Sequence, residues 1–397
     1  MYRRKKQVRI CFVSSFPPSR GRLSEYAFAL INSLQKHSEI TKIDILGDTI
    51  NGKTTVPISD KTVLHRVWKP EKPVSLLMVP MYILRIRPDI VHFNLHMAVF
   101  GRGRLSNFIG LGLPLLCRLM GLRVLVTLHN ITERIDLQKT GFSNSFINKI
   151  GALFATKLLT LSNMLTVTVK SYVELLRTKY KCKNVVWIPH GTWYSGPLNS
   201  DCGEKDTILY IGHHGPYKDL ELLSKSYHLI RKNRRVKLII AGSSHPDYPN
   251  LLEEWYDKSP DKSDDMDFLG YVPEQELPKL FGCVSVVVLP YYTCTGTSGV
   301  AHLASSFGTP IVATDLPEFR DLVSSGCGIV LSGHTPEELA GKIESILDRT
   351  TLVQELRNKN NCFAKQRSWD VIASQFCTLY ANLLDGKKLP EEVGNGP

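Results

Sequence analysis

Short β-rich runs alternate with amphipathic segments of helical length along most of the chain, and this alternation restricts the fold more than any other feature. Runs such as Val284–Pro290 are almost continuously apolar, which is typical of strands buried on both faces of a parallel sheet. Alternating strands and helices predict an α/β fold with helices on both faces of each sheet. The expected strands are Val8–Ser14, Lys42–Gly47, Asp89–Asn94, Arg123–Leu128, Leu165–Val169, Val185–Pro189, Thr207–Gly212, Val236–Gly242, Met266–Gly270, Val284–Pro290, Thr309–Thr314 and Gly328–Leu331. The expected helices include Ser24–Gln35, Val74–Arg87, Leu105–Met120, Ser143–Thr160 and Ser171–Tyr180, and the chain closes on Pro336–Asp348 and Ser368–Leu384.

A polar stretch, Ser195–Asp206, interrupts the alternation near the middle of the chain. Because 397 residues exceed what one hydrophobic core usually supports, we expect two doubly wound, Rossmann-like domains. The predicted divisions are an N-terminal domain of residues 1–195, a C-terminal domain of residues 196–367, a helix of residues 368–385 that crosses back to the first domain, and a disordered tail of residues 386–397. Such folds bind ligands at the carboxyl ends of their strands, here in a cleft between the two sheets.

The two halves differ in charge. Residues 1–195 contain 29 Lys and Arg against 10 Asp and Glu, a net charge of +19, whereas the remainder contains 20 against 27, a net charge of −7. A basic half attracts anionic lipid, nucleic acid or a phosphorylated substrate. Arg104 and Arg118 flank the apolar run Phe108–Leu116, which favours peripheral contact with an anionic membrane; a core helix with a solvated face is the alternative. Nucleic acid is not expected, because no interleaving of aromatic and basic residues occurs.

The start of the chain and its cysteines indicate the compartment. The basic residues Arg3–Lys6 precede only four continuous apolar residues, Ile10–Val13, fewer than a secretory signal needs. The longest apolar candidate, Ile109–Leu128, is interrupted by Arg118 and Arg123 and does not predict a membrane span. Nine cysteines without a Cys-x-x-Cys pair predict neither a disulfide framework nor structural zinc. We therefore expect a cytoplasmic protein, peripheral at the inner face of the membrane if it contacts lipid.

Four loops at the expected carboxyl ends of strands combine Gly, His, Lys or hydroxyl residues. They are Pro17–Gly21, Thr127–Asn130, Gly212–Lys218 and Pro290–Gly299. The last loop opens a helix, whose free N–H groups and positive dipole end favour a diphosphate, and Lys218 could add a cation to the same anion. The alternatives are ordinary capping by Thr297 and Ser298 and a solvated lysine. A dinucleotide site is not expected, because neither candidate turn carries Gly-x-Gly-x-x-Gly.

Several segments also occur in a characteristic order. In the second half these are Ile208–Gly212 followed by Lys218 and Asp219, then Val236–Gly242, Phe268–Val272, Gly308–Asp315 and Arg367–Tyr380. In the first half they are Phe16–Gly21, Pro88–His92, Thr127–Asn130 and Ile188–Gly191. In this order and spacing they resemble the family-4 retaining glycosyltransferases. The resemblance implies the GT-B fold, a nucleoside-diphosphate sugar as co-substrate, and no cofactor or metal.

The resemblance also implies roles for individual residues. Lys218 would support the departing diphosphate and His129 would lie beside the donor sugar, as the two catalytic residues. The residues expected to bind the donor are Gly21, His213, Gly270, Tyr271, Val272, Thr295, Gly296, Thr297, Ser298 and Gly299. His213 stands where the family usually has Arg. Two Glu that the family carries eight residues apart would fall at or near Thr295 and Leu303, but no Asp or Glu lies between Glu276 and Asp315, so the donor sugar stays open.

Two other patterns are interpreted as structural or left open. Asp265-Met266-Asp267 spells the metal-binding Asp-x-Asp of a different glycosyltransferase fold, but it lies in an acidic stretch before a strand and is interpreted as a solvated turn. His92, His96 and His190 either line the cleft or cap strands.

The sequence thus predicts a metal-independent hexosyltransferase that moves a sugar, with retention, from a nucleoside-diphosphate sugar to a saccharide or lipid-linked acceptor in polysaccharide or glycolipid assembly. One alternative is a non-catalytic GT-B paralogue that binds a nucleotide or partners an active glycosyltransferase. Another is a sugar-nucleotide epimerase on the same fold.

Overall fold

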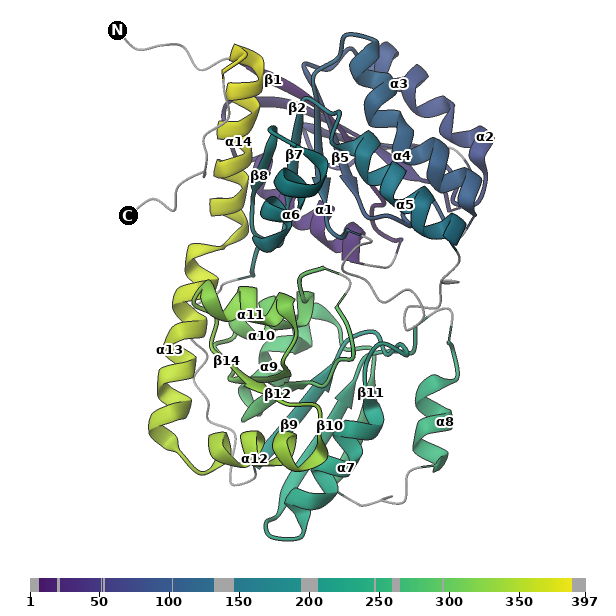
Figure 1. Cartoon of the computed structure of the whole chain (residues 1–397). Coiled ribbons are helices and arrows are strands. Elements are labelled where there is room, and N and C mark those ends of the chain that lie inside the picture. Colours follow the sequence, from purple (N-terminus) through teal and green to yellow (C-terminus); the bar gives the residue numbers. More distant parts are fainter. Residues whose placement is uncertain are drawn as a thin grey trace, which may run out of the picture. The chain divides into compact units, whose positions relative to one another are not determined.

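The computed structural model describes residues 7–19, 22–50, 52, 54–101, 103–131, 146–193, 206–245, 248–258, 265–294 and 296–387 (Figure 1). The contacts divide the chain into two units: of the described residues, those up to 131, 146–191 and 369–387 form the first, and those from 192 to 368 form the second. Each unit has its own predominantly parallel sheet and its own hydrophobic core. The prediction of two Rossmann-like α/β domains is therefore confirmed.

The first unit is built on an eight-stranded sheet in the order β3-β4-β2-β1-β5-β6-β7-β8. The strands are β1 (Val8–Val13), β2 (Ile40–Asp48), β3 (Thr55–Pro57), β4 (Thr62–Trp68), β5 (Ile90–Leu95), β6 (Val124–Leu128), β7 (Met164–Val167) and β8 (Val185–Trp187). All neighbouring pairs are parallel except β3 and β4. The strand order changes direction between β1 and β5, and ligands bind at such switch points in open α/β sheets.

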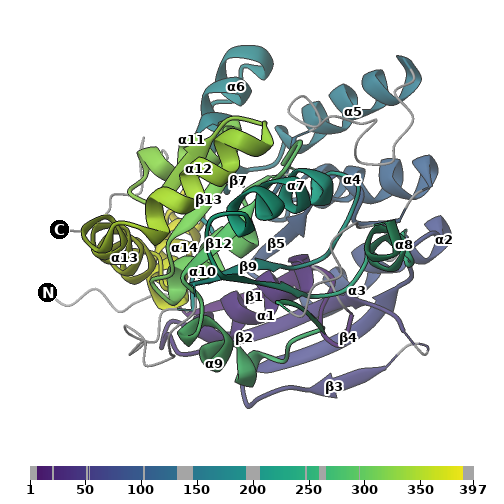
Figure 2. The same ribbon diagram turned by 90° about the horizontal axis from the view of Figure 1, so that it is seen from below.

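Helices accompany this first sheet. They are α1 (Arg22–Leu34), α2 (Pro73–Leu76), α3 (Met78–Ile86), α4 (Arg104–Leu119), α5 (Phe146–Leu159), α6 (Ser171–Tyr180) and α14 (Trp369–Asp385). The last helix, α14, returns to this unit and lies beside α1 (Figures 1 and 2). It is held there in part by a hydrogen bond of 2.7 Å between Tyr380 Oη and His92 Nδ1 on β5.

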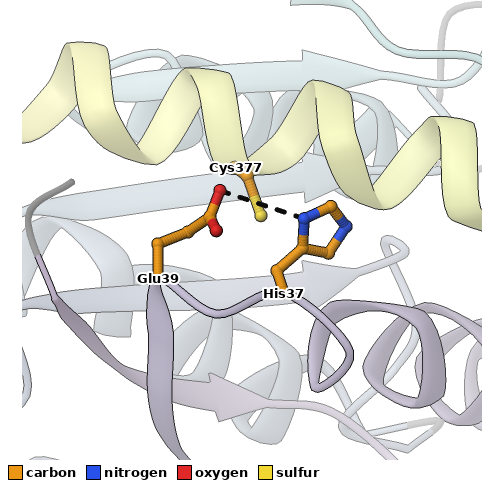
Figure 3. A group of neighbouring side chains, drawn as sticks. All are labelled: His37, Glu39 and Cys377. Atoms are coloured by element: carbon orange, nitrogen blue, oxygen red, sulfur yellow. Dashed lines mark ion pairs between the residues drawn. The ribbon is translucent and has the colours of Figure 1, made fainter. Parts of the chain in front are cut away.

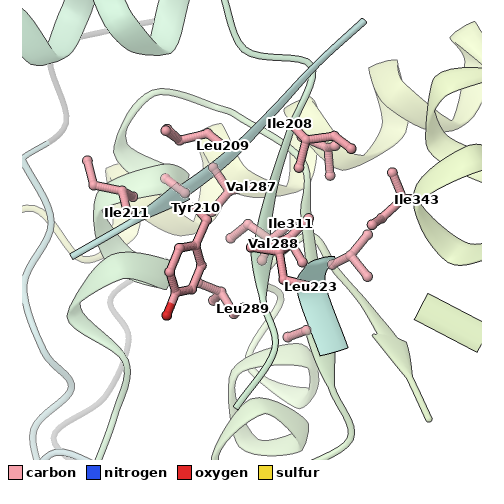
Figure 4. Close-up of a cluster of buried hydrophobic side chains, with 14 of the residues drawn as sticks. Ile208, Leu209, Tyr210, Ile211, Leu223, Val287, Val288, Leu289, Ile311 and Ile343 are labelled. Atoms are coloured by element: carbon pink, nitrogen blue, oxygen red, sulfur yellow. The ribbon is translucent and has the colours of Figure 1, made fainter. Parts of the chain in front are cut away.

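The second unit is built on a six-stranded parallel sheet in the order β11-β10-β9-β12-β13-β14. The strands are β9 (Asp206–Ile211), β10 (Val236–Ala241), β11 (Met266–Gly270), β12 (Val286–Leu289), β13 (Ile311–Thr314) and β14 (Ile329–Ser332). The helices are α7 (Leu220–Arg231), α8 (Leu251–Lys258), α9 (Leu277–Gly282), α10 (Gly299–Ser306), α11 (Pro317–Ser324), α12 (Pro336–Leu347) and α13 (Thr350–Gln366), with a 3₁₀ turn at Glu274–Glu276. Apolar side chains of β9, β12 and β13 form the centre of the core (Figure 4), and the switch point of this sheet lies between β9 and β12.

The structure adds elements that the apolar pattern does not reveal. Strands β3 and β4 and helix α13 were not expected, and Val74–Arg87 forms two helices, α2 and α3, rather than one. The buried strand β4 was missed because it contains Arg66, whose Nη1 donates to the carbonyl oxygens of Phe16 and Asp48 at 3.1 and 2.8 Å. A buried, hydrogen-bonded arginine breaks the apolar run that marks other strands.

The boundaries also shift by a few residues. The chain leaves the first unit after Gly191 and returns to it at Trp369, compared with the expected divisions at 195/196 and 367/368. Residues 388–397 of the expected tail lie outside the described residues. None of the helices in the described ranges combines the length and the apolar character needed to cross a membrane. None of the eight described cysteines is in a disulfide bond.

Candidate functional site

The loops after β9 and β12 meet at the switch point of the second sheet. Lys218 forms an isolated antiparallel bridge with Tyr291, and the amide of Asp219 donates to the carbonyl oxygen of Pro290 at 2.6 Å. The amide of Tyr292 returns a bond of 2.9 Å to the carbonyl oxygen of Tyr217. These backbone bonds join Gly212–Lys218 to the start of Pro290–Gly299, two of the four loops selected from the sequence.

Lys218 is buried at this junction, with 4% of its surface exposed. Its Nζ lies 5.1, 5.6 and 5.9 Å from the ring centroids of Tyr291, Tyr210 and Tyr217. A Cβ placed on Gly212 would be 3.0 Å from this Nζ and 3.1 Å from a methyl group of Val300. The ammonium therefore sits between the end of β9 and the first turn of α10, over the electron-rich faces of aromatic rings.

The first turn of α10 is the other half of this site. Ser298 is its N-cap, and its Oγ accepts from the amide of Ala301 at 3.3 Å. Thr297 Oγ1 lies 2.9 Å from Nε2 of the buried His302. Gly296 precedes this turn with a φ of 108° and Gly299 is the first helical residue. Ordinary capping thus does occur, and it leaves the positive end of the helix beside the Lys218 ammonium.

Two histidines follow Gly212. His213 Nδ1 lies 3.4 Å from Ser243 Oγ, whereas His214 is fully buried and its Nε2 donates to the carbonyl oxygen of Ala241 at 3.0 Å. Burial, with a smaller contribution from the nearby Lys218 charge, lowers the pKa of His214 to about 3. His214 is therefore a neutral structural residue. Nothing in the sequence singles out His214, because two adjacent His residues carry no signal that separates their roles.

The loop after β11 lies at the same edge of the sheet. The amide of Gly242, at the end of β10, donates to the carbonyl oxygen of Gly270 at 2.5 Å. Tyr271 is 63% exposed, and Val272 packs partly buried against the core. Gly270 is thus joined through Gly242 to the Gly212 turn. Thr295 lies outside the described residues.

The first unit has its own polar cluster at its switch point. His129, directly after β6, lies with Nε2 2.6 Å from Asn94 Oδ1 at the end of β5. The Asn94 amide donates to Ser14 Oγ at 2.9 Å and to the carbonyl oxygen of Leu23 at 3.3 Å. Because the Asn94 oxygen must then accept, Nε2 of His129 carries the proton. The Tyr26 ring packs edge-on against the imidazole at 4.5 Å. Gly21, the other residue selected here, lies outside the described residues.

Asn94 is the functional candidate that sequence reasoning missed. It ends a buried apolar strand and is itself fully buried, and a buried amide at a strand end was the available signal. Its two donor bonds orient the carbonyl oxygen toward His129, so it holds the imidazole in one tautomer.

The three first-unit histidines that the sequence left open, His92, His96 and His190, make structural contacts. His92 is fully buried, bonded to Tyr380 Oη and, at 2.7 Å, to Thr127 Oγ1, and burial lowers its pKa to about 3. His96 Nδ1 accepts from the amide of Ala98, and His190 Nδ1 donates to the carbonyl oxygen of Gly191. These bonds favour the strand-capping interpretation.

Asp265 lies directly before β11, whereas Asp267 lies within this strand rather than in the expected solvated turn. Both carboxylates have basic partners: Asp267 pairs with Lys237 at 2.5 Å and Asp265 with Arg231 at 3.9 Å.

Comparison with known proteins finds a family model that is similar to part of the second unit. Residues 205–349 match the family model described as "Glycosyl transferases group 1", a range that contains the Lys218 and α10 loops. The chain is 28% identical over 181 residues to an uncharacterized glycosyltransferase, MJ1607, of Methanocaldococcus jannaschii, and 23% identical over 173 residues to the O-antigen chain mannosyltransferase B of Escherichia coli. The first alignment covers 45% of this chain and the second 43%, and each spans 45% of the relative; the chain thus matches less than half the length of these relatives.

Solved structures match almost the whole chain. The sucrose-phosphate synthase of Thermosynechococcus elongatus superposes with a TM-score of 0.76 at 19% identity, over 96% of this chain and 100% of that one. The Anabaena protein Alr3699/HepE in complex with UDP superposes with a TM-score of 0.68 at 14% identity, over 94% of this chain and 100% of that one. The chain therefore has the GT-B fold, and its residues 205–349 match the family model of the glycosyl transferases group 1.

Proposed function

We propose that this protein transfers a hexosyl group from a nucleoside-diphosphate sugar to an acceptor hydroxyl, with retention and without a metal ion. The observation that carries the proposal is the position of the Lys218 ammonium beside the first turn of α10. The ammonium and the helix N-terminus are both positive, so bringing them together costs free energy that an anion between them would offset. A diphosphate leaving group is an anion of suitable charge.

The chemistry of such a site is electrostatic. As the glycosidic bond breaks, negative charge develops on the diphosphate, and the fixed ammonium and the amides of the α10 turn stabilise it without reorganisation. His129, whose Nε2–H is held by Asn94, would position the donor sugar. The names of the relatives, which include a mannosyltransferase and a protein solved with UDP, support a nucleotide-sugar donor and a role in polysaccharide or glycolipid assembly.

Isothermal titration of UDP and GDP tests the donor site. Lys218→Met removes the charge and keeps the length of the side chain, so affinity for the preferred nucleotide should fall about 10- to 100-fold, as expected for a charge-assisted hydrogen bond of about 1.5–3 kcal/mol. Lys225→Met on α7 is the matched control, because Lys225 is exposed and pairs with Glu221 on the same helix. If neither nucleotide binds the wild type, the donor site is refuted.

A second candidate function is nucleotide binding without catalysis. It is motivated by the absence of Asp and Glu between Glu276 and Asp315. A donor panel assayed with and without membrane extract separates the possibilities. A glycosyltransferase releases nucleotide when an acceptor is present, and a non-catalytic paralogue binds nucleotide but releases none. An epimerase on this fold releases sugar and nucleotide without an acceptor.

We further propose that the acceptor is lipid-linked and that the first unit rests on an anionic membrane. Three exposed apolar stripes support this proposal: Val74, Leu77, Met81 and Leu84 on α2 and α3; Leu105, Phe108, Leu116 and Leu119 on α4; and Ile150, Leu153 and Phe154 on α5. Phe108 and Phe154 stack at 5.9 Å, which joins α4 to α5. Helices α2 to α5 contain no Asp or Glu within their bounds, and exposed Arg85, Arg104, Arg118 and Lys157 accompany the stripes. Apolar residues among lysines and arginines suit an anionic lipid surface.

Vesicle sedimentation tests the membrane contact. Leu119→Glu should weaken binding to phosphatidylglycerol-containing vesicles about tenfold or more, because an exposed leucine that enters the bilayer contributes about 1.5–3 kcal/mol. Val323→Glu on α11 is the control, since it places the same charge at an exposed apolar position of the second unit. Equal binding of the two variants, or equal binding of the wild type to neutral vesicles, would contradict the proposal.

A further inference from the structure

Three side chains with metal-binding donor atoms converge in the first unit, outside the residues assigned above. They are His37, Glu39 and Cys377, whose donor atoms all lie within 4.8 Å of one another (Figure 3). His37 Nδ1 and Glu39 Oε1 are 3.9 Å apart, too far for a hydrogen bond. Among the residues that the structure describes, this is the only group of three or more His, Cys, Asp or Glu side chains close enough to share an ion.

Backbone contacts hold two of the ligands in place. His37 and Glu39 lie on the turn between α1 and β2. The amide of His37 donates to the carbonyl oxygen of Leu34, and that of Val8 donates to the carbonyl oxygen of Glu39 at 2.8 Å. Ser38 Oγ lies 3.4 Å from Glu39 Oε2, so the other carboxylate oxygen, Oε1, is the one directed at His37. The turn therefore presents the imidazole and the carboxylate together.

The third donor atom comes from helix α14, far along the chain from the other two. Cys377 is a buried residue of α14, and α14 packs beside α1. Two turns earlier on the same helix, Asp370 accepts from Lys36 Nζ at 2.7 Å, which adds a contact between the helix and the end of α1. His37 and Glu39 are about one-fifth exposed at their side chains, so the three donors are shielded but can still be reached from solvent.

The donor set is that of zinc. Imidazole nitrogen, carboxylate oxygen and thiolate sulfur bind Zn²⁺ at about 2.0–2.3 Å, which places two ligands of one ion roughly 3.3–3.8 Å apart. The observed separations exceed this by about 1 Å or less, a change that rotation of the partly exposed His37 and Glu39 side chains can supply. One carboxylate and one thiolate also neutralise a divalent charge, which makes partial burial of the ion acceptable.

We propose that His37, Glu39 and Cys377 bind one Zn²⁺ ion, which fastens α14 to the turn between α1 and β2. The thiol loses its proton to solvent when the ion binds, and a water molecule occupies the fourth position. Structural zinc was not expected from the sequence, because the chain contains no Cys-x-x-Cys pair. Glu39 and Cys377 are 338 residues apart, and only the return of α14 to the first unit brings them together.

Cobalt substitution of the full chain tests the site directly. Co²⁺ added to the metal-free protein should produce a thiolate-to-metal charge-transfer band, and one equivalent of Zn²⁺ should abolish it. Cys377→Ser should lose the band and bind Zn²⁺ at least tenfold more weakly. Cys362→Ser, at an exposed cysteine of α13, should behave as the wild type.

A second readout guards against a variant that fails to fold. His37→Gln changes only a turn residue and should also weaken Zn²⁺ binding at least tenfold, and Zn²⁺ should slow alkylation of Cys377 in the wild type but not in this variant. Zn²⁺ binding by Cys377→Ser within twofold of the wild type would mean that other histidines hold the ion. That result, or a Co²⁺ spectrum without a thiolate band, would overturn the proposal.

Discussion

At the scale of single residues, the second-unit site depends on two glycines at the ends of neighbouring strands. Gly212 directly follows β9 and has a φ of 122°, and Gly242 directly follows β10 and has a φ of 109°. A Cβ on Gly242 would lie 2.1 Å from the carbonyl oxygen of Gly212. Only glycine permits this backbone approach together with a positive φ, and the approach brings the loops after β9, β10 and β11 to one place.

Replacing Gly242 with alanine should therefore destabilise the protein strongly. The added methyl group meets backbone rather than a flexible side chain, and the left-handed conformation adds strain, so we expect Gly242→Ala to lower the free energy of unfolding by about 2–4 kcal/mol. Gly341→Ala is the control: Gly341 lies inside α12 with open space around a new Cβ, and the change should stabilise by about 0.5–1 kcal/mol. Urea unfolding measures both. Equal stabilities of the two variants would contradict the close approach.

At the scale of elements, α13 is attached to its unit by a buried amide rather than by an apolar stripe alone. Asn360 is fully buried. Its Oδ1 accepts from the amide of Gly328 at 2.7 Å, and its Nδ2 donates to the carbonyl oxygen of Thr309 at 2.7 Å. One side chain thus satisfies backbone groups at the starts of β13 and β14 and fixes the helix against both.

Asn360→Leu tests how much the amide hydrogen bonds of Asn360 stabilise α13, because it removes these bonds and leaves the apolar packing nearly unchanged. Leucine nearly keeps the volume but leaves a buried N–H and a buried C=O without this partner, at a cost of about 1–3 kcal/mol each, so α13 should show faster amide hydrogen exchange and a lower unfolding midpoint. Asn358→Leu on the same helix replaces an exposed asparagine whose Oδ1 accepts from the exposed Gln354 Nε2, and it should change stability by less than about 0.5 kcal/mol. Similar effects of the two changes would argue against the role of Asn360.

The same contacts explain which elements the sequence could predict. Helix α6 and strand β11 have the predicted bounds because a helical pattern and an apolar run identify them locally. Helix α13 and strand β4 escaped prediction because Asn360 and Arg66 are buried through hydrogen bonds to distant carbonyls. Such polar residues look like surface residues in a sequence.

The candidate site likewise contains some residues that the sequence could identify and others that it could not. The Lys218 and α10 loops could be selected because strand ends are visible as the ends of apolar runs. The pairing of Asn94 with His129 could not, because it depends on which strands become neighbours in the sheet. The roles assigned to the selected residues, and the cleft expected between the two sheets, stay predictions.

At the scale of the whole molecule, each unit contains a fully buried histidine that burial keeps neutral. His92 joins β5 of the first unit to α14, and His214 supports the turn after β9 in the second. Burial lowers the pKa of both to about 3, against an ordinary value of about 6.5. The folded protein thus keeps both rings neutral at pH values where the unfolded chain binds a proton on each. Both units should therefore lose stability over the same range of mildly acidic pH, although their sheets share no strand.

The sign and the pH window follow from the linkage. Because the folded pKa values are lowered, this stability is fully present above pH 6.5 and is lost as the pH falls from 6.5 toward 3. At pH 5 the lowered pKa of each histidine should therefore reduce the free energy of unfolding by about 2 kcal/mol relative to neutral pH.

His92→Gln and His214→Gln offer amide groups in place of the ring nitrogens and cannot titrate. Each should therefore reduce the loss of stability between pH 7 and pH 5, read by hydrogen exchange on β5 for the first and on β10 for the second. His228→Gln, at an exposed position of α7, should leave the wild-type slope unchanged. If none of the three substitutions changes the dependence of stability on pH, protonation of carboxylates rather than of His92 and His214 would explain the acid sensitivity.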